Sequence, residues 1–159
     1  MDVFIISNAH SYRRDLAAAY GENLDSEEVL ASWAEGSART YSELLSISQR
    51  VIRIADTPAP VRDVPDCLSD NPGDASKCNL NVKTQARLDG KLISAERSVA
   101  PKEVSFIDPT SLVCPANPCP AVDDSGIIKY YDQQHLTRTF SRSLAQGLGN
   151  LIESAMGKR

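Results

Sequence analysis

The chain has 159 residues, of which 42% are hydrophobic and 24% are charged. This composition fits one globular domain and excludes a disordered segment. The net charge of -4 and the scattered Lys and Arg residues exclude the basic surface of a nucleic-acid-binding protein. No apolar run reaches the roughly 20 residues of a membrane helix, and the first residues lack the positive segment of a signal peptide.

The first third of the chain predicts one strand and two helices. Residues 2–6 form a short apolar run that is typical of a buried parallel strand, and residues 7–8 end it. A helix follows, with Asp25 as its predicted N-cap. We expect Gly36 to interrupt this helix before a second one covers residues 41–48.

The middle of the chain predicts two more strands around a polar excursion. The β-branched residues in 51–55 indicate a strand. Residues 58–78 are rich in Pro and Asp, too polar and broken for a core element, so we expect an ordered surface excursion. A helix is predicted over residues 80–93, and residues 104–107 indicate a third strand.

The last predicted element is a helix that begins near Arg138 with Thr137 as its N-cap. Its apolar residues recur at steps of four, four and three, as on a core-facing stripe: Phe140, Leu144, Leu148 and Leu151. Strands that alternate with helices indicate a mostly parallel sheet covered on both faces. The sequence therefore predicts a three-layer α/β/α fold and a single domain over residues 1–159.

The four cysteines are Cys67, Cys78, Cys114 and Cys119. They lie in loops, in two closely spaced pairs, which favours two local disulfides, although four cysteines allow three connectivities and the sequence does not choose. A zinc site is the alternative, but neither spacing is that of a zinc ribbon. Disulfides indicate an oxidising compartment. We therefore expect an export or membrane segment upstream of this chain and a place on the extracytoplasmic face of a membrane.

A possible catalytic pair precedes the last helix, where Asp132 stands three residues before His135. A histidine that takes a proton from a hydroxyl must be held in one tautomer, and a carboxylate on its other ring nitrogen does this. The alternative is a purely structural hydrogen bond. Trp33 and the pair Tyr130–Tyr131 are expected in the core and at its rim. The sequence has no glycine-rich phosphate loop, so no cofactor is expected.

Five segments, in chain order, resemble the SGNH (GDSL-like) hydrolases: Val51–Pro58, Val64–Cys67, the Cys114 and Cys119 pair, Tyr131–Thr137 and Arg142–Ala145. Within that family they are most similar to the C-terminal SGNH domain of membrane-bound acyltransferases that modify cell-surface glycans. The resemblance covers nearly the whole chain. It implies an SGNH or flavodoxin-like α/β/α fold, incomplete at its N-terminus.

The resemblance also implies a serine nucleophile, with His135 as general base and Asp132 as its orienting group. The family's serine stands in a Gly-Asp-Ser motif, which this chain lacks, so we expect it upstream of Met1. Asn8 is the candidate oxyanion donor, because the family's asparagine comes from a strand-end loop. Ser7 is a weaker candidate for the nucleophile.

Two functions follow from these expectations. The first is the C-terminal portion of an esterase or O-acyltransferase domain that acts on acylated carbohydrate or another acyl ester, with an upstream membrane acyltransferase domain as partner. The second is a non-catalytic remnant or glycan-binding module that keeps the fold without the nucleophile. Neither uses a metal or a cofactor.

Overall fold

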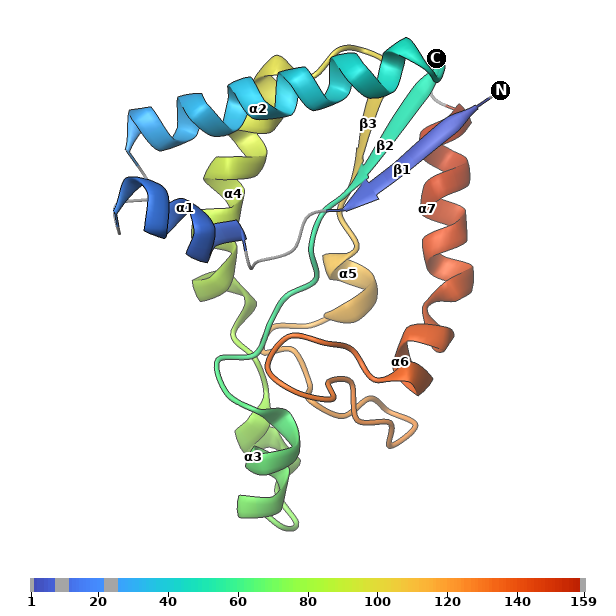
Figure 1. Cartoon of the computed structure of the whole chain (residues 1–159). Helices are drawn as coiled ribbons and strands as arrows, with labels where there is room; N and C mark the ends of the chain where they lie inside the picture. The colour runs from blue at the N-terminus through green and yellow to red at the C-terminus, as the bar shows by residue number, and fades with distance from the viewer. Residues whose placement is uncertain (1, 8–11, 22–25, 158–159) are drawn as a thin grey trace. The chain divides into compact units, whose positions relative to one another are not determined.

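The structure is a computed structural model that describes residues 2–7, 12–21 and 26–157 (Figure 1). The chain divides into two compact units. The first, here the sheet unit, comprises Met1–Asp56, Arg87–Asp108 and Ile152–Arg159. The second, here the disulfide unit, comprises Thr57–Ala86 and Pro109–Leu151.

The sheet unit contains three parallel strands, β1 (Val3–Ser7), β2 (Arg50–Ile54) and β3 (Val104–Ile107). They lie in the order β1-β2-β3, so β2 is central. Each strand lies within one residue of its prediction, and the predicted α/β class with a parallel sheet is confirmed. Parallel pairing requires crossover connections, which helices supply here.

The longest helix of the sheet unit is α2 (Glu27–Ser46), and Ser26 caps it by accepting a hydrogen bond from the Val29 amide. The predicted interruption at Gly36 is wrong, because α2 continues through this residue. A helix-interior glycine costs about 1 kcal/mol relative to alanine. Burial of Val29 and Tyr41 on the inner side of α2 offsets that cost.

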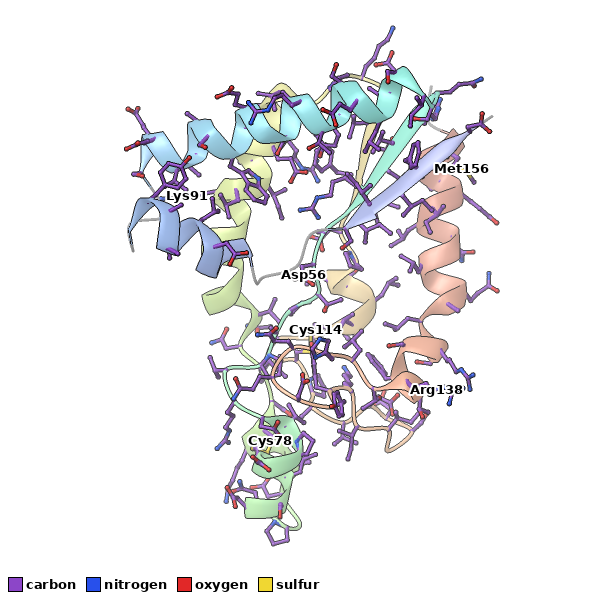
Figure 2. All side chains as sticks on the ribbon, in the orientation of Figure 1. Asp56, Cys78, Lys91, Cys114, Arg138 and Met156 are labelled. Atoms are coloured by element: carbon purple, nitrogen blue, oxygen red, sulfur yellow. A yellow bond between two sulfur atoms is a disulfide. The ribbon has the colours of Figure 1, made fainter. Side chains whose placement is uncertain are left out.

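Two further helices complete the sheet unit beside α1 (Tyr12–Tyr20): the C-terminal parts of α4 (Val82–Val99) and α7 (Ala145–Gly157). One face of the sheet meets α2 and α4, where Arg53 pairs with Glu96 of α4. The other face meets the end of α7 (Figure 1). There Arg50 donates to the carbonyl oxygen of Met156 at 2.8 Å. Figure 2 labels Met156 near the end of α7. Helices therefore cover both faces, as the sequence predicted.

The disulfide unit contains four short helices: α3 (Val64–Asp70), the 3-10 helix η1 (Ala75–Cys78), α5 (Thr110–Val113) and α6 (Arg138–Ser143). Cys67 is bonded to Cys78 and Cys114 to Cys119, so the prediction of two local disulfides is confirmed. The structure resolves the connectivity that the sequence left open. All four cysteines belong to the buried core of this unit.

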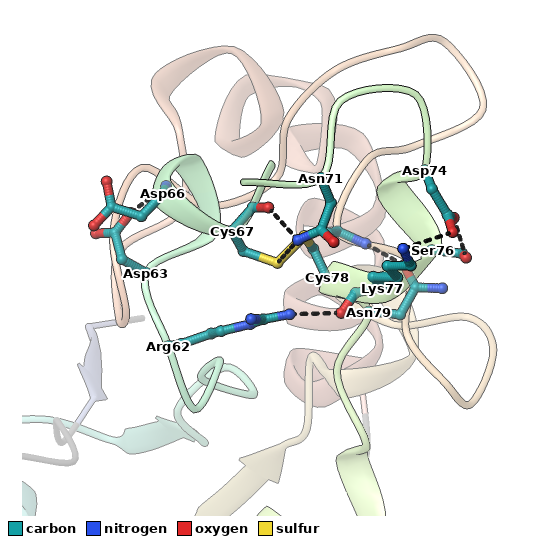
Figure 3. Close-up of a disulfide and its surroundings, with 11 residues drawn as sticks. Arg62, Asp63, Asp66, Cys67, Asn71, Asp74, Ser76, Lys77, Cys78 and Asn79 are labelled. Atoms are coloured by element: carbon teal, nitrogen blue, oxygen red, sulfur yellow. Dashed lines mark hydrogen bonds and ion pairs between the residues drawn. A yellow bond between two sulfur atoms is a disulfide. The ribbon is translucent and has the colours of Figure 1, made fainter. Parts of the chain in front are cut away.

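The first disulfide joins α3 to η1 within the predicted polar excursion (Figure 3). The excursion is more regular than predicted, because Asp63 caps α3 by accepting a hydrogen bond from the Asp66 amide at 3.0 Å. Asn71 closes the other end by donating to the Cys67 carbonyl oxygen at 2.8 Å. Local capping thus gives order to a segment with few apolar residues.

Two helix boundaries differ from the predictions. Leu80 does not begin α4 but forms an antiparallel bridge with Cys119. The predicted last helix is split into α6 and α7 at Leu144. Its predicted N-cap is confirmed, since the Thr137 hydroxyl accepts a hydrogen bond from the Phe140 amide at 3.2 Å. Among the residues that the structure describes, no helix is both long and apolar enough to span a membrane.

Candidate active site

The loop that carries Asp132 and His135 is a hairpin in the disulfide unit. Residues 127–131 pair with residues 121–123 on one side and with residues 135–137 on the other. The Tyr131 amide donates to the His135 carbonyl oxygen at 2.9 Å, which closes the loop. These short pairings were not predicted from the sequence, because each involves only one or two residues and none has the length of a predicted strand.

Asp132 organises the hairpin through both of its oxygens. Its Oδ1 accepts hydrogen bonds from the backbone amides of Gln134 and His135, each at 2.7 Å. Its Oδ2 lies 2.7 Å from Nδ1 of the His135 ring. The carboxylate therefore fixes the loop and the ring together, and the structure brings the two predicted residues into contact.

The protonation states follow from this geometry. Hydrogen bonds from the His135 and Gln134 amides, followed by that from the His135 ring, lower the pKa of Asp132 to about 2. The carboxylate is ionised at neutral pH and can only accept hydrogen bonds. The Nδ1 atom of His135 must then carry the proton. In the neutral ring, Nε2 is left with a lone pair, as a general base requires.

The ring of His135 is open to solvent, with 72% of its side chain exposed. Within the described part of the chain, its side-chain hydrogen bond is the one to Asp132. Tyr131 stands beside it, with the two ring centroids 6.3 Å apart and a tilt of 48° between the rings. The free side of the imidazole can thus receive a hydroxyl proton from a molecule or segment that approaches it.

Two buried side chains anchor the hairpin to other segments of the disulfide unit. Tyr130 is fully buried, and its hydroxyl donates to the Pro58 carbonyl oxygen. Lys129 is 2% exposed, and its Nζ donates to the Val113 carbonyl oxygen at 2.8 Å. Burial lowers the pKa of Lys129.

The expectation for the Tyr pair is confirmed, with Tyr130 in the core and Tyr131 66% exposed at its rim. The burial of Lys129 was not predicted, because no local sequence pattern marks a lysine as buried.

The model of one protein family, the SGNH domain fused to AT3 domains, matches residues 1–149. The chain belongs to this SGNH family. No curated protein and no solved structure matches the chain significantly. The match confirms the family that the sequence motifs suggested, and it agrees with the α/β fold.

The other predicted site residues of this SGNH domain lie elsewhere in the chain. Ser7 is the last residue of β1, in the sheet unit. Asn8, the predicted oxyanion donor, lies outside the residues that the structure describes. Asp132 and His135 belong to the disulfide unit. In the described ranges, the SGNH domain has no group of three or more His, Cys, Asp or Glu side chains that could hold a metal ion.

Proposed function

We propose that this SGNH domain takes part in acyl transfer or ester hydrolysis at hydroxyl groups of a cell-surface glycan, with acetyl as the typical acyl group. His135 is the general base and Asp132 orients it. One observation carries the proposal: an ionised carboxylate lies 2.7 Å from Nδ1 of a histidine whose ring is otherwise exposed. This is the arrangement that a base needs at neutral pH.

In the proposed reaction, Nε2 of His135 takes the proton of a serine hydroxyl as its oxygen attacks the ester carbonyl. The ester carbon–oxygen bond then breaks, and the imidazolium returns the proton to the leaving alkoxide. Asp132 stabilises the imidazolium without taking the proton. The acyl group leaves the serine for water in hydrolysis or for a glycan hydroxyl in transfer. This chain contains no Gly-Asp-Ser motif, the motif in which the serine is expected to stand.

The partner domain and the cellular location of this SGNH domain are each proposed on one observation. The family's domains are fused to AT3 domains, which supports an upstream acyltransferase domain as partner. Two disulfides support an oxidising, extracytoplasmic location. We propose that residues 1–159 form the C-terminal part of one SGNH domain, with Asn8 as an oxyanion donor.

The test is hydrolysis of p-nitrophenyl acetate by the complete protein that contains this chain. His135→Ala is expected to lower kcat by about 10³-fold, because the serine then has no base. Gln133→Ala is the matched control: it changes an exposed side chain in the same loop and leaves the Asp132 hydrogen bonds in place. Unchanged turnover in His135→Ala would remove His135 from the mechanism.

A non-catalytic, glycan-binding role is the second candidate, and the absence of Gly-Asp-Ser favours it. The two functions differ in one measurement. If the complete protein binds acetylated oligosaccharides but releases no acetate, and His135→Ala binds equally well, the second role holds. Acetate release that depends on His135 supports the first.

A further inference from the structure

The sheet unit contains a pocket that the proposed reaction does not use. Its volume is about 270 Å³. The residues that line it come from β1, α1, α2 and α4: Ile6, Leu16, Ser32, Trp33, Gly36, Ser37, Thr40, Tyr41 and Glu96. Every one of them belongs to the sheet unit. The pocket is therefore a feature of one compact unit.

A buried carboxylate stands in the wall of this pocket. Glu96 is 2% exposed, and its Oε1 accepts hydrogen bonds from the Arg53 Nε at 3.1 Å and from the Tyr41 hydroxyl. Burial, followed by the hydrogen bond to Glu96, raises the pKa of Tyr41, so the phenol keeps its proton and remains a donor. Three polar groups, from β2, α2 and α4, thus meet at the wall of the pocket.

The second oxygen of Glu96, Oε2, lacks a hydrogen-bond partner among the described residues. Oε2 is closed to solvent and, within the described part of the chain, accepts no hydrogen bond. A buried carboxylate oxygen without a donor destabilises the protein, and native structures rarely keep one without a reason. Because Glu96 forms part of the pocket wall, a donor group in the pocket is a candidate partner for this oxygen.

The chemistry of the wall defines the missing partner. Arg53 already neutralises the charge of Glu96, so the pocket needs a hydrogen-bond donor without a positive charge. Ile6, Leu16 and Trp33 supply an apolar lining. The volume exceeds the cavity of about 150 Å³ that holds benzene in another protein. A six-membered ring with one hydroxyl fits these limits.

We propose that this pocket binds a small uncharged alcohol, whose hydroxyl donates to Glu96 and whose apolar body packs against Trp33. The site is separate in its residues from the hairpin of Asp132 and His135. The hydroxyl proton of the proposed ligand distinguishes it from an apolar molecule, which has no hydrogen-bond donor. An apolar guest of the same size leaves the carboxylate oxygen without a donor.

The first experiment compares two probes that differ in this proton. Cyclohexanol and cyclohexanone have the same ring, but only the alcohol donates a hydrogen bond. Trp33 is the only tryptophan of the chain, so its indole ¹⁵N–¹H signal reports on the pocket. Titration of the chain is expected to shift this signal with both probes, with about fivefold tighter binding of cyclohexanol. Equal affinities, or no shift with either probe, overturn the proposal.

The second experiment locates the binding site with paired glycine variants. A Cβ atom at Gly36 meets only the Arg39 guanidinium, at 3.9 Å, and one at Gly90 meets nothing within 4 Å. Both Gly36→Ala and Gly90→Ala are therefore expected to raise the melting temperature. Only Gly36 lines the pocket.

Gly36→Ala is expected to weaken cyclohexanol binding, and Gly36→Leu to abolish it, because the new side chains occupy the pocket. Gly90→Ala is expected to bind cyclohexanol as the parent chain does. Melting curves establish whether each variant is folded. If Gly36→Leu does not fold, the comparison of Gly36→Ala with Gly90→Ala decides whether cyclohexanol binds in this pocket. Undiminished binding in a folded Gly36→Ala, or an equal loss in both alanine variants, overturns the proposal.

Discussion

A single side chain, Asp132, determines the geometry of the candidate site. Its three hydrogen bonds all go to groups within three residues along the chain. The hydrogen bonds that stabilise the negative charge of Asp132 also fix the turn, as the hydrogen bonds of an Asp side chain do in an Asx turn. Loss of this charge is therefore expected to disturb both the loop and the ring of His135.

The low pKa of Asp132 can be measured. Since the folded pKa of about 2 lies below the ordinary value of 3.8, ionised Asp132 stabilises the fold above that value. The stabilisation is lost as the pH falls from about 4 towards 2. We expect the carboxyl ¹³C signal of Asp132 to titrate with a midpoint near pH 2.

His135→Ala serves as the comparison for this titration. It removes the ring bond but keeps the two amide bonds, which are the larger causes of the low pKa. The midpoint is expected to rise and yet stay below 3.8. A midpoint at or above that value in the parent chain contradicts the hydrogen-bond geometry.

Among the elements, helix α6 is fixed by the residue that also ends the hairpin. The Thr137 hydroxyl accepts from the Phe140 amide and donates to the Ile128 carbonyl oxygen at 2.7 Å. Thr137→Ala removes both bonds and is expected to lower the free energy of unfolding by about 1–2 kcal/mol, as measured by urea denaturation. Thr139→Ala, on the exposed side of the same helix, is expected to have little effect. Equal losses in the two variants would exclude a capping role.

The strands were predictable because their signal is local. Apolar, β-branched runs bounded by polar or Pro-containing turns need no knowledge of the partner strand. The predicted run 104–107 coincides with β3, and the runs 2–6 and 51–55 each differ by one residue at either end. The same holds for the Thr137 cap and for the Asp132 and His135 contact, which span only a few residues.

The features that escaped prediction depend on distant parts of the chain. Leu80 pairs with Cys119, and Glu96 meets Arg53 across 43 residues. Burial of Lys129 depends on a carbonyl oxygen of Val113. Even the continuity of α2 is decided by its packing on the sheet. Tertiary contacts override local propensity at each of these places.

At the scale of the whole molecule, the two units share two helices, α4 and α7. The boundary between the units crosses α4 between residues 86 and 87 and α7 between residues 151 and 152. A helix is a cooperative element, so melting of one unit shortens helices that the other unit uses. The single domain predicted for residues 1–159 stays a prediction, which one cooperative unfolding transition would support.

The exposed edge strand β1 leads us to expect self-association of the chain. Within the described residues, β1 pairs with β2 alone, and Phe4 and Ile5 are 37% and 51% exposed. An uncharged apolar edge strand promotes pairing with another chain. Dynamic light scattering is expected to show association that grows with protein concentration, and Ile5→Lys is expected to reduce it. Val61→Lys is the control, since Val61 is 88% exposed but lies in the disulfide unit. A monomer at every concentration would contradict this expectation.

The short hairpin of Asp132 and His135 has a consequence for control of the site. Because the two groups are joined within one closed loop, any displacement of the loop carries both together and leaves their distance unchanged. The hydrogen bond between the Asp132 carboxylate and the His135 ring is then constant, and the access of the ring to a partner hydroxyl is the variable. Under the proposed function, a regulator of this protein would therefore act by moving the intact pair relative to the serine, without changing the contact between Asp132 and His135.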